Sequence, residues 1–334
     1  MKKKIHIFLR KKNSTSHHSI ERFTFSIAKY LKIKNTEIKV IKCPLTSKGI
    51  FNRLYLTIWA FFNQGDINHI IGDVHFISLL LNKKRTINTF LDCRLLHEFK
   101  GLKFFFYYLF WFKFPILKSS ILTFISDFTK KDLKKFSRFR NIENYVIPVP
   151  LFRENNNNNN NKKISDTWKI LIIGTEKHKN LFNMIKSTKG LKIELHIVGK
   201  INIEITNYIR KHRIKIKNYI DVDDNFINKL YFRCDILLMV SYFEGFGMPI
   251  IEAQHSKLAV ITSKLEPMNT VSGKEAAILV NPKKVVEIKK AINKIINNRN
   301  FYKKLIKNGK INSDKYKKIY INKEYKKIYQ RLLK

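Results

Sequence analysis

The chain has 334 residues, a length typical of two domains, and 44% of them are hydrophobic, as in an ordinary folded protein. Lys and Arg number 66 against 25 Asp and Glu, so the formal net charge is +41. The composition excludes a disulfide-stapled scaffold. The charge indicates a polyanionic partner (nucleic acid, anionic lipid or a phosphorylated substrate), or a solvated lysine-rich surface with no specific partner.

The three cysteines, Cys43, Cys93 and Cys234, lie far apart and form no C-x-x-C pair. This spacing argues against both a disulfide framework and a structural zinc site. It favours a reducing, cytoplasmic location.

Strands and helices alternate along the first half of the chain. We expect strands at 4–9, 37–42, 67–72, 85–91, 120–126 and 145–149, and a helix at 19–31. A further helix follows Ser126 or Asp127, either of which can cap it.

The most apolar stretch is 104–112, closed on both sides by lysine. A membrane span needs ~20 apolar residues, so this stretch does not cross a bilayer. The pattern favours two interpretations equally: a core helix, or a segment in the interfacial layer of an anionic membrane.

Seven consecutive asparagines, Asn155 to Asn161, separate two patterned halves. A polar homopolymer buries too little surface to order itself, so we place a linker at 153–165 between domains 1–152 and 166–312. We expect a last helix at about 313–334, with Ser313 as its N-cap, to pack back on the first domain.

The second half repeats the alternation. We expect strands at 168–173, 193–198, 235–240 and 259–262, and helices at 181–189, 203–212, 225–234, 249–256 and 285–297. The fold class is therefore α/β, with two parallel sheets, crossover helices and ligands outside the carboxyl ends of the strands.

The most informative segment follows the strand at 235–240. Gly245 and Gly247 make a tight loop that lets a ligand approach the backbone, and Pro249 suits the first turn of a helix. Two carboxylates, Glu244 and Glu252, bracket the loop; in so apolar a setting they need partners, and sugar or ribose hydroxyls are suitable donors.

Several strings together resemble a known family. The segment 244–252 (EGFGMPIIE) is similar to the E-x7-E motif of the retaining glycosyltransferases of family 4, the group 1 glycosyl transferases. Similar matches occur at 172–181 (IIGTEKHKNL), 193–199 (IELHIVG), 259–263 (AVITS) and 274–282 (KEAAILVNP). The first half matches more loosely, with 69–76 similar to a mannosyltransferase-like subgroup. The resemblance implies the GT-B fold, two facing Rossmann-like domains with a cleft between them, of which 1–152 binds the acceptor and 166–312 the nucleotide-sugar donor.

The resemblance also implies roles for single residues. Glu252 would hold the ribose hydroxyls of the donor and Glu244 a hydroxyl of its sugar. Lys179 would neutralise the diphosphate as the leaving group forms, since a fixed cation lowers that barrier. Glu244 and Lys179 are thus the expected catalytic residues.

Two loops would complete the donor site. Gly174 and Thr175 would line the phosphate loop, although many family members carry a basic residue where Thr175 stands. The backbone N–H groups of Phe246, Gly247 and Met248 would face the sugar and diphosphate at the start of a helix.

One departure concerns the first domain. The family often has a His-Asp pair after the strand that corresponds to 85–91, whereas this chain has Leu91 and Asp92. His17, His18 or His75 could replace the missing histidine, or the activity is weak or lost.

No metal and no cofactor besides the nucleotide-sugar co-substrate is expected. The D-x-D string at 221–224 precedes a helix, which Asp224 or Asn225 can cap, and Lys179 already serves the diphosphate.

These observations predict a glycosyltransferase that moves a sugar from a nucleotide-sugar to a glycan or lipid-linked acceptor in cell-surface polysaccharide biosynthesis. The alternative is an inactive homologue that only binds nucleotide or glycan. An RNA-binding protein is rejected, because no RNA-binding motif is present and two acids stand in the expected site. We expect a cytoplasmic protein, peripheral on the inner face of the cytoplasmic membrane.

Overall fold

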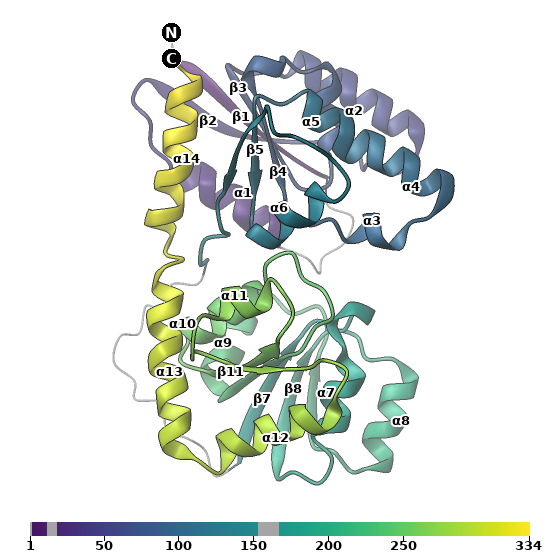
Figure 1. The fold of residues 1–334 in the computed structure, drawn as a ribbon, viewed down its shortest axis with the longest axis vertical. Coiled ribbons are helices and arrows are strands. Elements are labelled where there is room, and N and C mark those ends of the chain that lie inside the picture. Colours follow the sequence, from purple (N-terminus) through teal and green to yellow (C-terminus); the bar gives the residue numbers. More distant parts are fainter. Residues whose placement is uncertain (1, 12–18, 153–166) are drawn as a thin grey trace. The chain divides into compact units, whose positions relative to one another are not determined.

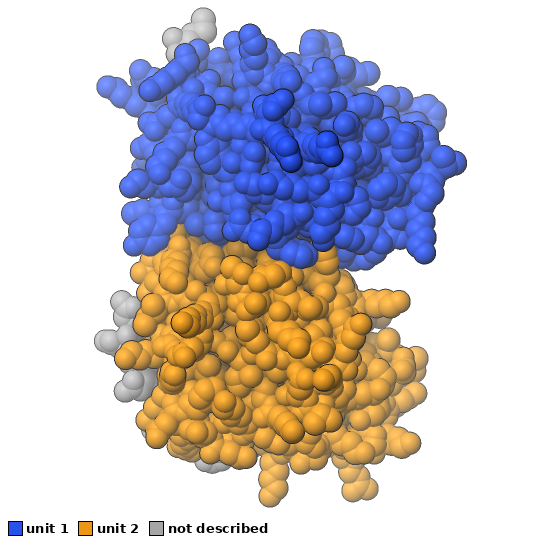
Figure 2. Space-filling model, in the orientation of Figure 1, with its two compact units in different colours: residues 1–152, 318–334 blue, residues 153–317 orange. Residues whose placement is uncertain are grey.

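The computed structural model describes residues 2–11, 19–152 and 167–334 (Figure 1). The chain divides into two compact units, Met1–Phe152 with Lys318–Lys334 (unit 1) and Arg153–Lys317 (unit 2) (Figure 2). The linker expected at 153–165, as well as His17 and His18, lie outside the described residues.

Unit 1 is built on a six-stranded parallel sheet in the order β2-β1-β3-β4-β5-β6. Its strands are β1 (Lys3–Leu9), β2 (Thr36–Lys42), β3 (Ile67–Ile71), β4 (Thr86–Phe90), β5 (Ile121–Phe124) and β6 (Glu143–Val146). Strands β3, β4 and β5 are buried along their whole length, because crossover helices cover both faces of such a sheet.

The helices of unit 1 are α1 (Ser19–Tyr30), α2 (Ile50–Phe62), α3 (Arg94–Glu98), α4 (Gly101–Tyr108), α5 (Phe114–Leu117), α6 (Asp127–Lys134) and α14 (Lys318–Leu332), with 3-10 turns η1 (His75–Leu80) and η2 (Lys83–Arg85) and a π-helical turn η3 (Leu109–Lys113). Ser126 caps α6, since its Oγ accepts from the N–H of Thr129. The sequence did not predict α2, whose apolar residues surround the helix instead of marking one face.

Helix α14 packs on unit 1 through a buried polar network. The hydroxyl of Tyr329 is 2.5 Å from Nδ1 of His69 on β3, and Nε2 of the same ring is 2.6 Å from the hydroxyl of Thr89 on β4. The ring of Tyr325 lies edge-on to Phe23 of α1. The last helix of the chain is thus joined to the centre of the first sheet.

Two buried histidines make the stability of unit 1 sensitive to acid. Burial lowers the pKa of His69 to about 3 and that of His75 to about 4. The unfolded chain protonates both near pH ~6.5, so it binds more protons than the folded chain below that pH. We expect stability to fall between pH ~6.5 and pH ~4, by up to about 1.4 kcal/mol per pH unit for each histidine. Urea unfolding across this range measures it, and an unchanged free energy of unfolding would contradict neutral, buried imidazoles.

Unit 2 has a second six-stranded parallel sheet, in the order β12-β11-β10-β7-β8-β9. Its strands are β7 (Trp168–Ile173), β8 (Ile193–Val198), β9 (Ile216–Tyr219), β10 (Ile236–Met239), β11 (Ala259–Ser263) and β12 (Ile278–Val280). The chain builds outward from β7 to β9, then returns to the other side of β7 with β10. This is the Rossmann order, and its switch point lies between β7 and β10.

The helices of unit 2 are α7 (Leu181–Ser187), α8 (Ile203–Lys211), α9 (Asp224–Arg233), α10 (Met248–His255), α11 (Met268–Ser272), α12 (Val285–Ile296) and α13 (Arg299–Asp314), with a 3-10 turn η4 (Lys177–Lys179). Together the two units confirm the predicted α/β class with two parallel sheets. None of the helices in the described ranges has the length and apolarity needed to cross a bilayer.

Two predicted helix caps are wrong. The N-cap of α9 is Asp223, whose carboxylate accepts from the N–H of Phe226, because α9 begins at Asp224 itself. Ser313 caps no helix; it is buried in the last turn of α13, where its hydroxyl donates to the carbonyl of Lys310. The helix expected at about 313–334 is α14, which begins at Lys318, after a separate helix α13 that ends at Asp314.

Candidate functional site

The predicted donor residues gather at the switch point of unit 2. Strands β7 and β10 are neighbours, with Ile170 paired to Ile236, and their following connections run to opposite sides. The loops after these two strands meet at the carboxyl edge of the sheet, where open α/β sheets bind ligands. The loop after β7 carries Gly174 and Lys179, and the loop after β10 carries Glu244.

Gly174 is required by the conformation of the first loop. Its φ is +91°, which disfavours any side chain. A Cβ built there would also lie 3.0 Å from Cε of Lys179, because the lysine side chain folds back over the glycine. Gly174 therefore makes room for Lys179.

Asn180 fastens the first loop to the rest of the unit. It adopts a left-handed φ of 61°, and its amide nitrogen donates to the carbonyls of Val240 (3.0 Å) and Pro282 (2.7 Å). The N–H of Tyr242 donates to the carbonyl of His178. The backbone that carries Lys179 is thus tied to the loop after β10. The motif at 172–181 predicts no separate role for Asn180, although asparagine is one of the few residue types that adopts this φ readily.

The two expected catalytic residues contact each other directly. Nζ of Lys179 donates to Oε1 of Glu244 over 2.7 Å, and the side chains are only 16% and 11% exposed. Each charge therefore satisfies the other within a half-buried site. The pair offers a cation to an anionic group and a carboxylate to a hydroxyl, and a fixed cation of this kind stabilises negative charge that develops on a leaving group.

Glu252 lies in the second turn of α10. Gly247, with a φ of +98°, precedes the helix, and Pro249 occupies its first turn as predicted. Glu252 is 4% exposed, and its Oε2 accepts from the hydroxyl of Tyr231 on α9 over 3.0 Å. A buried carboxylate needs such donors. No sequence pattern indicates Tyr231 as a partner, because it is 21 positions away along the chain.

The remaining predicted donor residues lie in the same two loops and at the start of α10. Phe246 is buried, with its ring edge-on to Tyr316 at 5.6 Å. Gly247 and Met248 form the start of α10, where backbone N–H groups have no intrahelical acceptor. The side chain of Thr175 packs against Gly199, so close that a Cβ on that glycine would lie 2.7 Å from the threonine hydroxyl.

Buried amides hold α10 in place. Gln254 donates to the carbonyls of Ser272 and Ala276, and Asn312 of α13 donates to Oε1 of Gln254 and to the carbonyl of Val271. Because these groups are fully enclosed, they fix the helix that carries Glu252.

The first-domain histidine candidates divide into two kinds. His75 is buried beside the end of β4, where Nε2 donates to the carbonyl of Thr89 and the ring stacks on Phe90 at 4.6 Å. Leu91 follows β4, and the carboxylate of Asp92 accepts from the N–H of Arg94. His75 is thus a packed residue in this structure, while His17 and His18 are not described.

Within the described ranges, no group of three or more His, Cys, Asp or Glu residues could hold a metal ion. The absence of a metal requirement stays a prediction.

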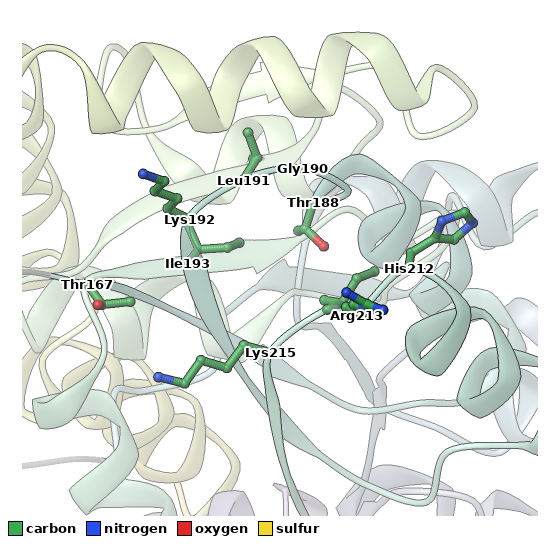
Figure 3. Close-up of a pocket in the computed structure, with 10 residues that line it drawn as sticks. Thr167, Thr188, Gly190, Leu191, Lys192, Ile193, His212, Arg213 and Lys215 are labelled. Carbon is green, nitrogen blue, oxygen red and sulfur yellow. The ribbon is translucent and has the colours of Figure 1, made fainter.

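A separate pocket of about 330 Å³ lies at the other end of the sheet of unit 2 (Figure 3). Its walls include Thr167 just before β7, Ile193 at the start of β8 and Lys215 just before β9. These positions mark the amino ends of the strands, whereas the Lys179–Glu244 pair lies at the carboxyl ends.

Comparison with solved structures shows which fold the chain has. The Anabaena protein HepE in complex with UDP and glucose is 14% identical, with a TM-score of 0.78 over 98% of this chain and 100% of that one. A glycosyltransferase from Rickettsia africae is 20% identical, with a TM-score of 0.74 over 100% and 99%. An Escherichia coli structure described as trehalose-6-phosphate bound with UDP-2-fluoro glucose is 10% identical, with a TM-score of 0.70 over 98% of both chains. The chain has the GT-B fold.

The family follows from the sequence of unit 2. Residues 153–312 match the model of the family described as glycosyl transferases group 1, so unit 2 carries the domain of that family. No curated protein gives a significant match. The family predicted from 244–252 and its companion segments is confirmed, and the protein is a glycosyltransferase; the mannosyltransferase-like subgroup stays a prediction.

Proposed function

We propose that the protein is a retaining glycosyltransferase that moves a sugar from a nucleotide-sugar to a glycan or lipid-linked acceptor in cell-surface polysaccharide biosynthesis. The observation that carries the proposal is the half-buried Lys179–Glu244 pair at the switch point between β7 and β10. It is supported by the family match of residues 153–312 and by the UDP and UDP-sugar complexes of proteins with the same fold.

The proposed reaction uses this pair as follows. The bond between the anomeric carbon and the diphosphate breaks, and a bond between that carbon and an acceptor hydroxyl oxygen forms on the same face. The acceptor proton passes to the departing phosphate. Lys179 neutralises the charge that develops on the diphosphate, while Glu244 accepts from a sugar hydroxyl and Glu252 from the ribose. No step requires a metal.

One observation favours a second candidate function. Leu91 stands where the family often has a histidine. The ring of His75 is hydrogen-bonded to the carbonyl of Thr89 and stacked on Phe90. A chain without the family's histidine could bind donor without turning it over.

A panel of nucleotide-sugars separates these proposals. We expect one donor class, with UDP-glucose tested first, to raise the melting temperature, because a ligand that binds only the folded state stabilises it by about 2.7 kcal/mol at 100 times its Kd. Release of the nucleoside diphosphate then supports the transferase. A thermal shift without release supports the binding module, and no shift with any donor contradicts both.

For location, we propose a cytoplasmic protein attached peripherally to the inner face of the cytoplasmic membrane. The apolar surface and positive charge of unit 1, described next, support this placement.

A further inference from the structure

Helix α2 presents an apolar face to solvent. Its inner side contributes Leu56 and Ala60 to the core of unit 1. On its outer side, each large apolar residue has more than one-third of its surface exposed, with Phe51 at 83% and Phe62 at 78%. The exposed set is Ile50, Phe51, Leu54, Tyr55, Ile58, Phe61 and Phe62. Most of these follow the 3–4 residue spacing of one helical face, so α2 is apolar both inside and outside.

Helix α4 presents a second apolar face. Leu102 is 76% exposed, and Phe105, Phe106 and, in the following η3, Phe110 continue the face at helical spacing, all exposed. Ordinary solvated helices carry charged residues at such positions.

Both faces belong to one flank of unit 1. The guanidinium of Arg53 on α2 lies 4.8 Å from the centre of the Trp111 ring in η3, which continues α4. Leu56 of α2 and Phe112 of η3 share one core cluster. Figure 1 shows α2, α4 and α5 along the same side of the unit 1 sheet. We call the exposed apolar residues of the two helices the α2–α4 surface. Monomeric soluble proteins rarely expose so many large apolar side chains together, so this surface calls for a partner.

The charged residues on the two apolar segments themselves are all basic. The segments 47–64 and 99–118 contain no Asp or Glu. Their basic residues are Lys48, Arg53, Lys100, Lys103, Lys113 and Lys118. A second copy of a chain with a net charge of +41 would be repelled, whereas an anionic surface would be attracted.

We propose that the α2–α4 surface inserts into the interfacial layer of a membrane that contains anionic lipids. Phenylalanine and leucine side chains enter the boundary between headgroups and acyl chains, and the lysines at the ends of the helices contact lipid phosphates. The sequence pattern indicated only the α4 segment, and α2 adds seven further exposed apolar side chains. The inference concerns unit 1 and does not depend on the donor site, so its failure would leave the proposed transfer untouched.

Vesicle flotation with the full-length chain tests this inference. We expect binding to vesicles of phosphatidylcholine with phosphatidylglycerol, little binding to phosphatidylcholine alone, and weakening by salt. The double variants Phe51→Gln/Phe62→Gln and Leu102→Gln/Phe106→Gln should each bind roughly tenfold more weakly, because each removes two inserting side chains. The matched control, Ile203→Gln/Val286→Gln, replaces two apolar residues of unit 2 that are also more than half exposed and should bind like the parent chain.

Charge is tested separately. Lys100→Gln/Lys103→Gln/Lys118→Gln should lose more binding than Lys200→Gln/Lys211→Gln/Lys303→Gln, which removes the same charge from exposed sites in unit 2. Three results would each overturn the inference. They are an equal loss of binding in the two triple variants, equal binding by the apolar variants and their control, and no binding by the parent chain. A dimer in light scattering that the α2 and α4 variants dissociate would also overturn it, since the occupant would then be a second copy.

Discussion

Replacing Lys179 with alanine is expected to lower the turnover of the nucleotide-sugar roughly 10²–10³-fold, the effect of removing one fixed stabiliser of transition-state charge. Lys179 is held for this task by the turn at Gly174, by the amide of Asn180 and by the carboxylate of Glu244. Its amine therefore needs little reorganisation when charge develops on the diphosphate. The loss should appear mainly in kcat, because the charge is larger in the transition state than in the bound donor.

Lys177→Ala is the matched control for this experiment. Lys177 belongs to the same 3-10 turn but is exposed, so its loss should change kcat less than threefold. Lys179→Ala leaves Glu244 without its partner, so thermal unfolding must first show that the variant is folded; Lys179→Arg keeps the charge and should retain more activity. Equal kcat values for Lys177→Ala and Lys179→Ala would rule out the proposed role of Lys179.

The second large effect is expected from Glu252→Gln, which keeps the size of the side chain and removes its charge. Hydrogen bonds to charged groups are worth about 1.5–3 kcal/mol, so donor affinity should fall roughly 10- to 150-fold. Isothermal titration with the nucleoside diphosphate alone measures the contact at the ribose without the sugar. The amide can still accept from Tyr231, so the variant should remain folded.

Two controls separate direct from indirect effects at Glu252. Glu204→Gln removes an exposed acid from α8 and should leave affinity unchanged. Tyr231→Phe removes the donor to Oε2 of Glu252 and should weaken binding less than Glu252→Gln does, since the carboxylate stays in place. Unchanged affinity in Glu252→Gln would show that the ribose does not bind at Glu252.

The fold was predictable where strands are continuous apolar runs. Strands β7 and β8 have the predicted bounds, because both are buried on two faces and followed by glycine. Strand β12 has only three residues, and β9 alternates with polar residues at the edge of its sheet, so neither gave a clear pattern. Helix α2 was not predicted, because its outer face is also apolar and the sequence therefore shows no helical period of apolar and polar residues.

The site was predictable in its residues but not in its contacts. Glu244 and Lys179 were found through motifs, yet they are 65 positions apart, and no local pattern shows that they pair. Tyr231 and the amides of Gln254 and Asn312 act through tertiary packing, which determines partners that single-residue propensities cannot. Ser313 shows the converse, since a good capping residue lies inside a helix when packing extends that helix past it.

A crystal structure of the chain with the nucleotide-sugar that gives the largest thermal shift tests the central claim most directly. We expect the diphosphate within hydrogen-bond distance of Nζ of Lys179, the ribose against Glu252, and the sugar beside Glu244. Donor bound instead at the amino ends of β7–β9, in the pocket beside Lys215, or anywhere away from the switch point of unit 2, would contradict it.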